Sequence, residues 1–368
     1  MAHHKKTIIR CRSAKRKRHR KSKRVCCSDR GTCLERAKHL YIIGNGFDLH
    51  HHIPSSYNDF KEWLEDNDID TLYKVENILE TDEPKWWNEF ETNLGKPFAV
   101  KLYAESVAFE NQPDYASDDY RDRDLYVAEY EVERELGGLI NDMKSDFQEW
   151  ASQLSAGDGG QVVKLETKDS VFLTFNYSLT LEKLYCIPAD RVKHIHGNAL
   201  DKESIVVGHG RDYGSYRNDL EDEMPEPPPD LPAEEYERWL EDAADRYSDD
   251  YPTSQAKDAA AYVMKDIQKN VPSIIAKNRD FFQSLNDIKK IHIYGFSFAE
   301  VDLPYLIEVT QNVNMKNIEM EISYYSDNDK KKAEAFCELM SLTPKKVTFI
   351  KLENIKKYKQ LSLFELPV

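Results

Sequence analysis

A short apolar run, residues 40–43, stops abruptly at the triplet Gly44-Asn45-Gly46. The run has the length and the β-branched content of a buried strand, and the two glycines add no bulk and tolerate positive φ angles. In doubly wound folds, a tight turn after the first parallel strand brings backbone N–H groups close to the phosphates of a nucleotide. The same stretch also fits a strand that ends in an ordinary turn. The rest of the chain is needed to choose between these interpretations.

Further apolar runs, each with turn residues behind it, predict a parallel sheet. They cover residues 170–178, 192–197 with 204–210, 289–298, 318–327 and 345–352. Stretches with helical spacing lie between them, and strands that alternate with helices are typical of a parallel α/β sheet. We therefore expect a Rossmann-like α/β domain over residues 39–368.

Two stretches between the predicted strands are interpreted as helical insertions, at about 60–160 and about 211–288. Residues 55–66 have a serine cap and apolar residues at helical spacing, so they predict the first helix beyond the glycine turn. An acidic stretch at 121–153 fits one or two amphipathic helices. Residues 216–252 are too charged and too rich in proline for a core, which indicates a surface insertion or lid.

The segment WWNEFETNL, residues 86–94, opens the second predicted helix. Trp86, Trp87 and Phe90 recur at helical spacing, which favours a place in the core over a platform for substrate. Glu91 beside them is expected to be an exposed or capping carboxylate, with the alternative that it reaches the pocket.

Charge is divided unevenly along the chain. Residues 1–38 carry a local net charge of +13, which leaves −28 for residues 39–368. The basic segment has no apolar period and repels itself, so we expect a disordered tail. Such a tail suits electrostatic binding of nucleic acid, a nuclear address, or an extension without a role. The acidic remainder argues against a broad nucleic-acid surface on the folded part.

No apolar run approaches the roughly 18 residues that a membrane helix needs, and residues 1–38 have no apolar centre that would serve as a secretion signal. Four of the six cysteines lie in the tail, Cys186 and Cys337 stand apart in the body, and no pair has CxxC spacing. The sequence therefore predicts a cytoplasmic location, reduced thiols and no membrane partner.

Glycines or polar residues follow four of the predicted strands, at residues 44–48, 174–177, 194–197 and 295–297. Ligands of open α/β sheets bind in the crevice outside the carboxyl ends of the strands. We expect these four groups to converge at that crevice.

A metal site is an alternative use of the histidines. His194 and His196 share one face of their predicted strand, and His209 or Asp48 would be further ligands. A catalytic zinc site needs three protein ligands, and nothing in the sequence spaces the third, so no metal is predicted. The run 50–52 consists of three histidines in a turn, which we expect to be solvated.

The same stretches resemble the AbiH family, which is named for bacteriophage abortive infection. The resemblance is carried by IIGNGFDL at 42–49, WWNEFETNL at 86–94, FLTFNYSLTLEKLY at 172–185, HIHG at 194–197 and IYGFSFAEVDLPY at 293–305. As an ordered set they extend over residues 40–352. Their order also resembles the wider sirtuin-like fold, which includes bacterial NAD-hydrolysing defence proteins.

This resemblance implies an anti-phage effector whose nucleotide pocket hydrolyses NAD, as a glycohydrolase, at the nicotinamide–ribose bond. Asn176 takes the place of the asparagine that orients the water or the ribose, and His196 takes that of the catalytic histidine. The implied ligand-binding positions are Gly44, Asn45, Gly46, Phe47, Asp48, Thr174, Gly295, Ser297 and Asp302. Two positions depart from the sirtuin-like pattern, because Asp48 replaces a serine and Ser178 replaces an acid.

The residue types suit this chemistry. Breaking the nicotinamide–ribose bond expels a neutral leaving group from a cation, so the site must stabilise positive charge on the ribose and present a nucleophile. An amide that holds a water, and a histidine with an ordinary pKa of about 6.5, suit that task. The structural alternatives are a helix cap for Asn176, a satisfied turn histidine for His196, and a helix cap for Asp302 in place of a ribose contact.

Two other functions fit the same residues. The first is a non-catalytic nucleotide sensor that acts as a homo-oligomer or through a defence-system partner protein. The second is a nucleic-acid-directed defence protein that uses the basic tail.

Overall fold

The computed structural model describes residues 37–79, 85–155, 163–221, 225–247, 249–342 and 347–355. The basic tail lies almost entirely outside these ranges, so its disorder and its binding of nucleic acid stay predictions. Among the described helices, none combines the length and the apolar content that crossing a bilayer requires.

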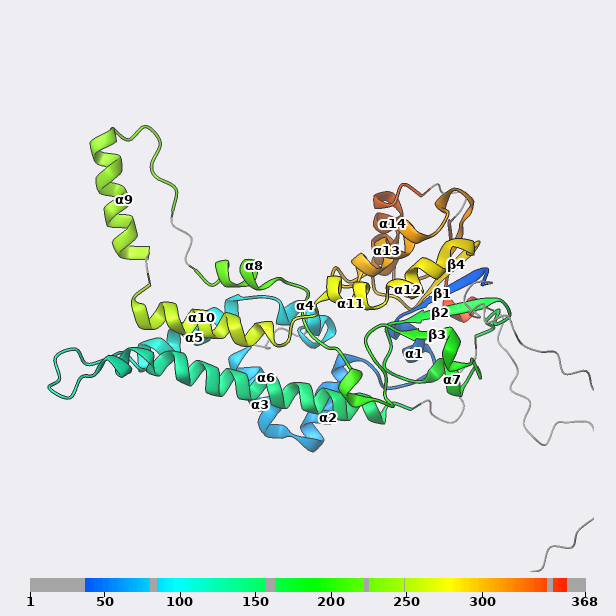
Figure 1. The fold of residues 1–368 in the computed structure, drawn as a ribbon, viewed down its shortest axis with the longest axis horizontal. Helices are drawn as coiled ribbons and strands as arrows, with labels where there is room; N and C mark the ends of the chain where they lie inside the picture. The colour runs from blue at the N-terminus through cyan, green and yellow to red at the C-terminus, as the bar shows by residue number, and fades with distance from the viewer. Residues whose placement is uncertain are drawn as a thin grey trace, which may run out of the picture. The chain divides into compact units, whose positions relative to one another are not determined.

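Within the described residues, six strands form one sheet in which every neighbouring pair is parallel (Figure 1). The strands are β1 (His39–Ile43), β2 (Ser170–Thr174), β3 (Val192–His194), β4 (Lys290–Tyr294), β5 (Glu319–Ser323) and β6 (Val347–Ile350). Their order is β3-β2-β1-β4-β5-β6. This is the order of doubly wound dinucleotide-binding folds, in which the sheet is extended in opposite directions on either side of β1 and β4. The predicted Rossmann-like α/β fold is confirmed.

Helices cover one face of the sheet. They are α11 (Val271–Lys277), α12 (Arg279–Gln283), α13 (Leu303–Asn312) and α14 (Asp327–Leu339). Every second residue of the central strands, such as Leu40 and Ile42 or Ile291 and Ile293, packs against this layer. The alternation follows from the two-residue period of a strand, which sends successive side chains to opposite faces.

The opposite face of the sheet carries larger aromatic side chains. Tyr41, Phe172 and Tyr294 lie there in a smaller cluster with Phe47 from α1 (Asn45–His50) and Leu181 from α7 (Thr180–Lys183). These two helices are short, so this face is covered mainly by its own aromatic rings and by loops.

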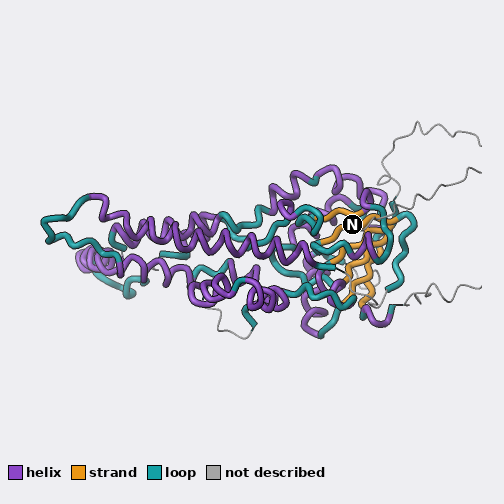
Figure 2. The backbone as a smooth tube through the Cα atoms, turned by 90° about the horizontal axis from the view of Figure 1, so that it is seen from below, coloured by secondary structure: helices purple, strands orange, loops and turns teal. Residues whose placement is uncertain are grey.

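The insertions form a separate helical layer with its own core, seen beside the orange strands in Figure 2. It contains α2 (Tyr57–Asn67), α3 (Ile69–Ile78), α4 (Phe90–Leu94), α5 (Phe98–Glu110), α6 (Val127–Gln153), α8 (Tyr213–Asn218) and α10 (Tyr251–Lys265). The local signals are as predicted, since Ser56 and Asp59 form a capping box at the start of α2. Trp86, Trp87 and Phe90 are buried in this core, which confirms the prediction for them.

One local prediction differs from the structure. Residues 204–210 are not a strand, because a short 3-10 turn and an irregular loop take their place, with Val206 N–H bonded to the carbonyl of His196. The acidic stretch at 121–153 was predicted to form one or two helices, and it forms one long helix, α6 (Val127–Gln153), after a 3-10 turn. The proline-rich insertion contains α9 (Ala233–Tyr247), an amphipathic helix with a strongly acidic composition.

Candidate functional site

The glycine turn after β1 packs against the turn after β4. The N–H of Gly46 donates to the carbonyl of Gly295 at 2.8 Å, and that of Gly44 donates to the carbonyl of Tyr294 at 3.0 Å. A Cβ on Gly44 would stand 2.6 Å from the Gly295 oxygen. The glycines are therefore needed for a close approach of two backbone segments at the switch point between β1 and β4.

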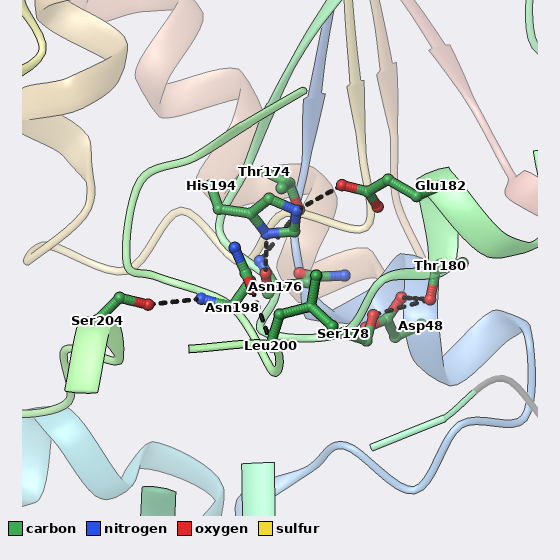
Figure 3. Close-up of polar contacts among 10 residues, drawn as sticks. All are labelled: Asp48, Thr174, Asn176, Ser178, Thr180, Glu182, His194, Asn198, Leu200 and Ser204. Carbon is green, nitrogen blue, oxygen red and sulfur yellow. Dashed lines mark hydrogen bonds and ion pairs between the residues drawn. The ribbon is translucent and has the colours of Figure 1, made fainter. Parts of the chain in front are cut away.

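Asp48 is buried on α1 and faces two hydroxyl groups that follow β2 (Figure 3). Ser178 and Thr180 both donate to its carboxylate, the latter at 2.8 Å. Burial raises the pKa of Asp48 above its usual range, while these hydrogen bonds act in the opposite direction. The departures at Asp48 and Ser178 are thus linked, because the two side chains satisfy each other.

Asn176 lies just beyond the end of β2 and is 5% exposed. Its backbone N–H donates to the Thr174 hydroxyl at 3.1 Å, and its carbonyl faces Nδ1 of His194, also at 3.1 Å (Figure 3). Neither atom of its side-chain amide makes a hydrogen bond of regular geometry among the described residues, although the amide lies close enough to the Asp48 carboxylate to help lower the pKa of that group. The helix-cap interpretation is wrong, because α7 begins after Leu179 and no side chain caps it.

His196 lies beyond the end of β3, the strand next to β2, and is almost fully enclosed. Its Nε2 lies 3.2 Å from the Tyr305 hydroxyl, and its Nδ1 lies 3.5 Å from Nζ of Lys269. Burial, and then the Lys269 ammonium, lowers the pKa of His196 well below its ordinary value. The imidazole is therefore neutral at physiological pH.

Lys269 was not predicted at this site, and Glu91 was placed there only by the alternative interpretation. Nζ of Lys269 lies 2.6 Å from one carboxylate oxygen of Glu91 and 2.7 Å from the other, with both side chains almost fully buried. The expectation that Glu91 is exposed or capping is wrong, because the folded insertion turns it toward the sheet. Lys269 stands in a loop without a recognisable motif, so only the contact itself identifies it.

Asp302 precedes α13 and completes this cluster. Its Oδ1 lies 3.8 Å from Nε2 of His196 and 4.0 Å from Nζ of Lys269, but it accepts no hydrogen bond within the described part of the chain. Burial raises the pKa of Asp302 to about 7, with Lys269 lowering it and Glu91 adding to the rise. The side chain does not cap α13, so the cap interpretation is wrong.

The remaining predicted residues lie around this centre with partners of their own. The Asn45 side chain bonds with Ser55, and Phe47 is fully buried, whereas Ser297 is exposed. Nothing in these contacts tests whether a ligand reaches them, so their binding roles stay predictions.

The histidines do not gather as the metal alternative would require. His194 pairs with Glu182 at 2.9 Å, away from the partners of His196, and His209 bonds with the carbonyl of Met264. No three His, Cys, Asp or Glu side chains within the described ranges are grouped to hold a metal ion. His51, expected to be solvated, is buried between the Phe47 carbonyl and the Tyr185 hydroxyl.

Comparison with family models places these residues in a known group. The model described as "Bacteriophage abortive infection AbiH" matches residues 40–324, well over half of the chain. The chain belongs to the AbiH family. This AbiH protein therefore has a role in phage defence by abortive infection. A search of curated proteins found none whose sequence matches it. The matched range contains Asn176, His196, Lys269 and Asp302, so the cluster lies within the family's own domain.

Proposed function

We propose that this AbiH protein binds a nicotinamide nucleotide at the carboxyl ends of β1 to β4 and hydrolyses NAD at the nicotinamide–ribose bond. The observation that carries the proposal is Asn176, a buried amide whose two polar atoms make no regular hydrogen bond among the described residues, just beyond β2, the strand next to the one that precedes His196. A buried polar atom without a partner costs about 1–3 kcal/mol. Such atoms persist where a ligand or an ordered water satisfies them.

The chemistry assigns a task to each group. Asn176 holds a water by its amide, and the enclosed carboxylates of Asp302 and Glu91 favour positive charge on the ribose as the C1′–N1 bond breaks. The water oxygen bonds to C1′, nicotinamide leaves with the electron pair of the broken bond, and the water loses one proton. Asp302, whose pKa is raised to about 7, is the group of this cluster suited to proton transfer near neutral pH.

The strand order supports a nucleotide over other small molecules, because ligands of this sheet type bind at the switch point between β1 and β4. A cleft of about 510 Å³ lies on the same loops, within the usual range for small-molecule sites. It is lined by Gly210, by residues of α11 and by residues on either side of Asp302: Val271, Pro272, Ile275, Glu300, Val301 and Pro304. Asn176 and His196 are buried and do not line it, so substrate entry requires a local opening.

The test combines turnover with stability in Asn176→Ala. If Asn176 serves a ligand, purified Asn176→Ala loses nicotinamide release yet unfolds with the same or a slightly higher free energy, because the unpartnered amide is removed. Asn93→Ala is the matched control, since this buried amide donates to the Trp86 carbonyl at 2.7 Å within the helical core. Asn93→Ala should lose about 1 kcal/mol or more of stability and keep its turnover. A destabilised Asn176→Ala with normal turnover contradicts the proposal.

The enclosure of His196 favours one second candidate, a nucleotide sensor that binds without hydrolysis. Calorimetry with NAD and ADP-ribose separates the two functions. Binding that depends on Asn176, with no nicotinamide released by the wild-type protein, identifies a sensor.

A further inference from the structure

We propose that Lys269 is a positioning residue that sets the tautomer of His196, and that Asp302 consequently accepts the proton of the attacking water. The assignment of the proton rests on the proposed hydrolysis, whereas the role of Lys269 can be tested without any turnover.

The Nδ1 side of the His196 imidazole faces Lys269. Nζ of Lys269 lies 3.5 Å from Nδ1 of His196. An ammonium has donors only, so it faces a ring nitrogen favourably only when that nitrogen carries a lone pair. In a neutral imidazole the single proton then resides on Nε2.

The Nε2 side of the His196 imidazole faces two oxygen atoms. The Tyr305 hydroxyl lies 3.2 Å away and Oδ1 of Asp302 lies 3.8 Å away. An Nε2–H group is a donor toward both oxygens, and an ionised carboxylate can only accept. His196 is therefore a hydrogen-bond donor in this arrangement, and the lone pair that a base needs is turned toward Lys269.

The Lys269 ammonium is held in place by its own partners. Glu91 on α4 holds Nζ of Lys269 with both of its carboxylate oxygens, at 2.6 and 2.7 Å. The backbone N–H of Lys269 also donates to the carbonyl of His209 at 2.7 Å. Moving the lysine would leave a buried carboxylate unpaired, which typically costs about 3–5 kcal/mol. Both charges come from the insertions, so the helical layer controls the protonation of a residue on the sheet.

Asp302 is the group available to accept the proton of the water. Oδ1 of Asp302 is buried and accepts no hydrogen bond from the described residues, so it is free to take one from a water. Burial raises the pKa of Asp302 to about 7, which suits a base that works near neutral pH. The water proton passes to Asp302 and then to solvent as the new C1′–O bond forms and nicotinamide departs.

The titratable groups around His196 come from several elements, with Tyr57 and Tyr177 near Glu91 and Asp302, and the test varies the charged ones. Lys269 follows α10, Asp302 and Tyr305 belong to the start of α13, and Glu91 acts through Lys269. Burial, and then the nearby carboxylates, raises the pKa of Tyr305, so its hydroxyl stays protonated.

The first experiment is imidazole ¹⁵N spectroscopy of the full chain, with His196→Gln used to assign the signal. The wild-type spectrum should show the Nε2–H tautomer and no protonation over the pH range in which the protein is folded. Lys269→Met should populate the other tautomer or make His196 titrate, and Lys269→Arg should restore the wild-type signal. An unchanged His196 signal in Lys269→Met overturns the positioning role.

Two further variants provide a replacement for Lys269→Met, should it not fold, and a control for it. Glu91→Gln with Lys269→Met removes the pair without leaving a lone buried charge, so it replaces Lys269→Met if that variant does not fold. Lys257→Met is the matched control, because Lys257 is also fully buried and pairs with Glu105 at 2.9 Å and Asp249 at 2.8 Å, within the helical layer. It should lose stability and leave the His196 signal unchanged.

The second experiment measures nicotinamide release. Asp302→Asn should lower kcat by about 100-fold or more, while Lys269→Met should lower it about tenfold, because the imidazole is then only misplaced. Wild-type turnover in Asp302→Asn overturns the assignment of the proton. If the wild-type protein releases no nicotinamide but its His196 responds to Lys269→Met, the proposed function is wrong and the positioning role stands. If nicotinamide is released and the His196 signal is the same in every Lys269 variant, the positioning role alone is wrong.

Discussion

Gly46 and Gly295 lie back to back, with the N–H of the first bonded to the carbonyl of the second at 2.8 Å. Gly295 has φ +64°, and a Cβ at that position would stand 2.0 Å from the backbone nitrogen of Phe47. The glycine turn thus has a role in the fold whether or not a ligand approaches it, because it lets the loops after β1 and β4 meet.

We expect Gly295→Ala to destabilise the protein by about 3 kcal/mol or more, since it adds both a clash and a left-handed conformation. Gly138→Ala in the middle of α6 is the control, because a Cβ there meets nothing within 4 Å. That substitution should stabilise by about 0.5–1 kcal/mol. Urea unfolding of both variants is the measurement, and equal stability in both would show that the two turns do not pack as described.

Asp48 should act as a structural carboxylate. Asp48→Ala leaves the hydroxyls of Ser178 and Thr180 without their acceptor, so we expect a loss of about 1–3 kcal/mol in unfolding free energy. Asp48→Asn should change the affinity for NAD or ADP-ribose little, because both carboxylate oxygens are already occupied by protein hydroxyls. A large fall in affinity for Asp48→Asn, measured by calorimetry, would instead place the carboxylate on the ligand.

Asp302 should make stability depend on pH. Its pKa is raised to about 7 in the folded state from an ordinary value of 3.8. Its contribution is present below 3.8, where both states are protonated, and is lost as pH rises through 7. Asp302→Asn should therefore stabilise the protein at pH 8 and have little effect at pH 4. The upper limit of the gain is about 4 kcal/mol, since each pKa unit corresponds to about 1.4 kcal/mol. Thermal melts at the two pH values test this, and an equal effect at both would refute it.

His51 should contribute to acid lability. Burial lowers its pKa from 6.5 to about 4, so the unfolded chain binds a proton over a pH range in which the folded protein does not. Stability provided by the neutral imidazole is complete above 6.5 and is lost as pH falls through 4. Replacing His51 with Gln should reduce the loss of stability between pH 7 and 4.5, by at most about 3 kcal/mol. The urea midpoint of this variant should be measured across this pH range and compared with that of the wild-type protein. The same dependence of the midpoint on pH in both proteins would count against the assignment.

Local features of the sequence were sufficient for the sheet. Strand runs depend on the backbone preferences of the residues and on short apolar periods, and these placed β1, β2, β4 and β5 close to their observed starts. The predicted runs at β2, β4 and β5 continue into the turns beyond the strand ends. Residues 204–210 also form a short apolar run, but they are not a strand, because their apolar side chains pack onto the helical layer and not into the sheet. A short apolar run does not say which neighbour will bury it.

The sequence alone determined the class of fold, the order of its strand-end motifs and the presence of Asn176 and His196 in those motifs. Only the tertiary structure decided which of these side chains lack internal partners, since a hydrogen bond between residues far apart in the chain leaves no local trace. The pair of Glu91 and Lys269, 178 residues apart, is of the same kind. Glu91 belongs to a motif whose aromatic residues predict a core, and Lys269 belongs to a loop without a motif. Their meeting beside His196 depends on how two separate insertions pack, which local preference does not encode.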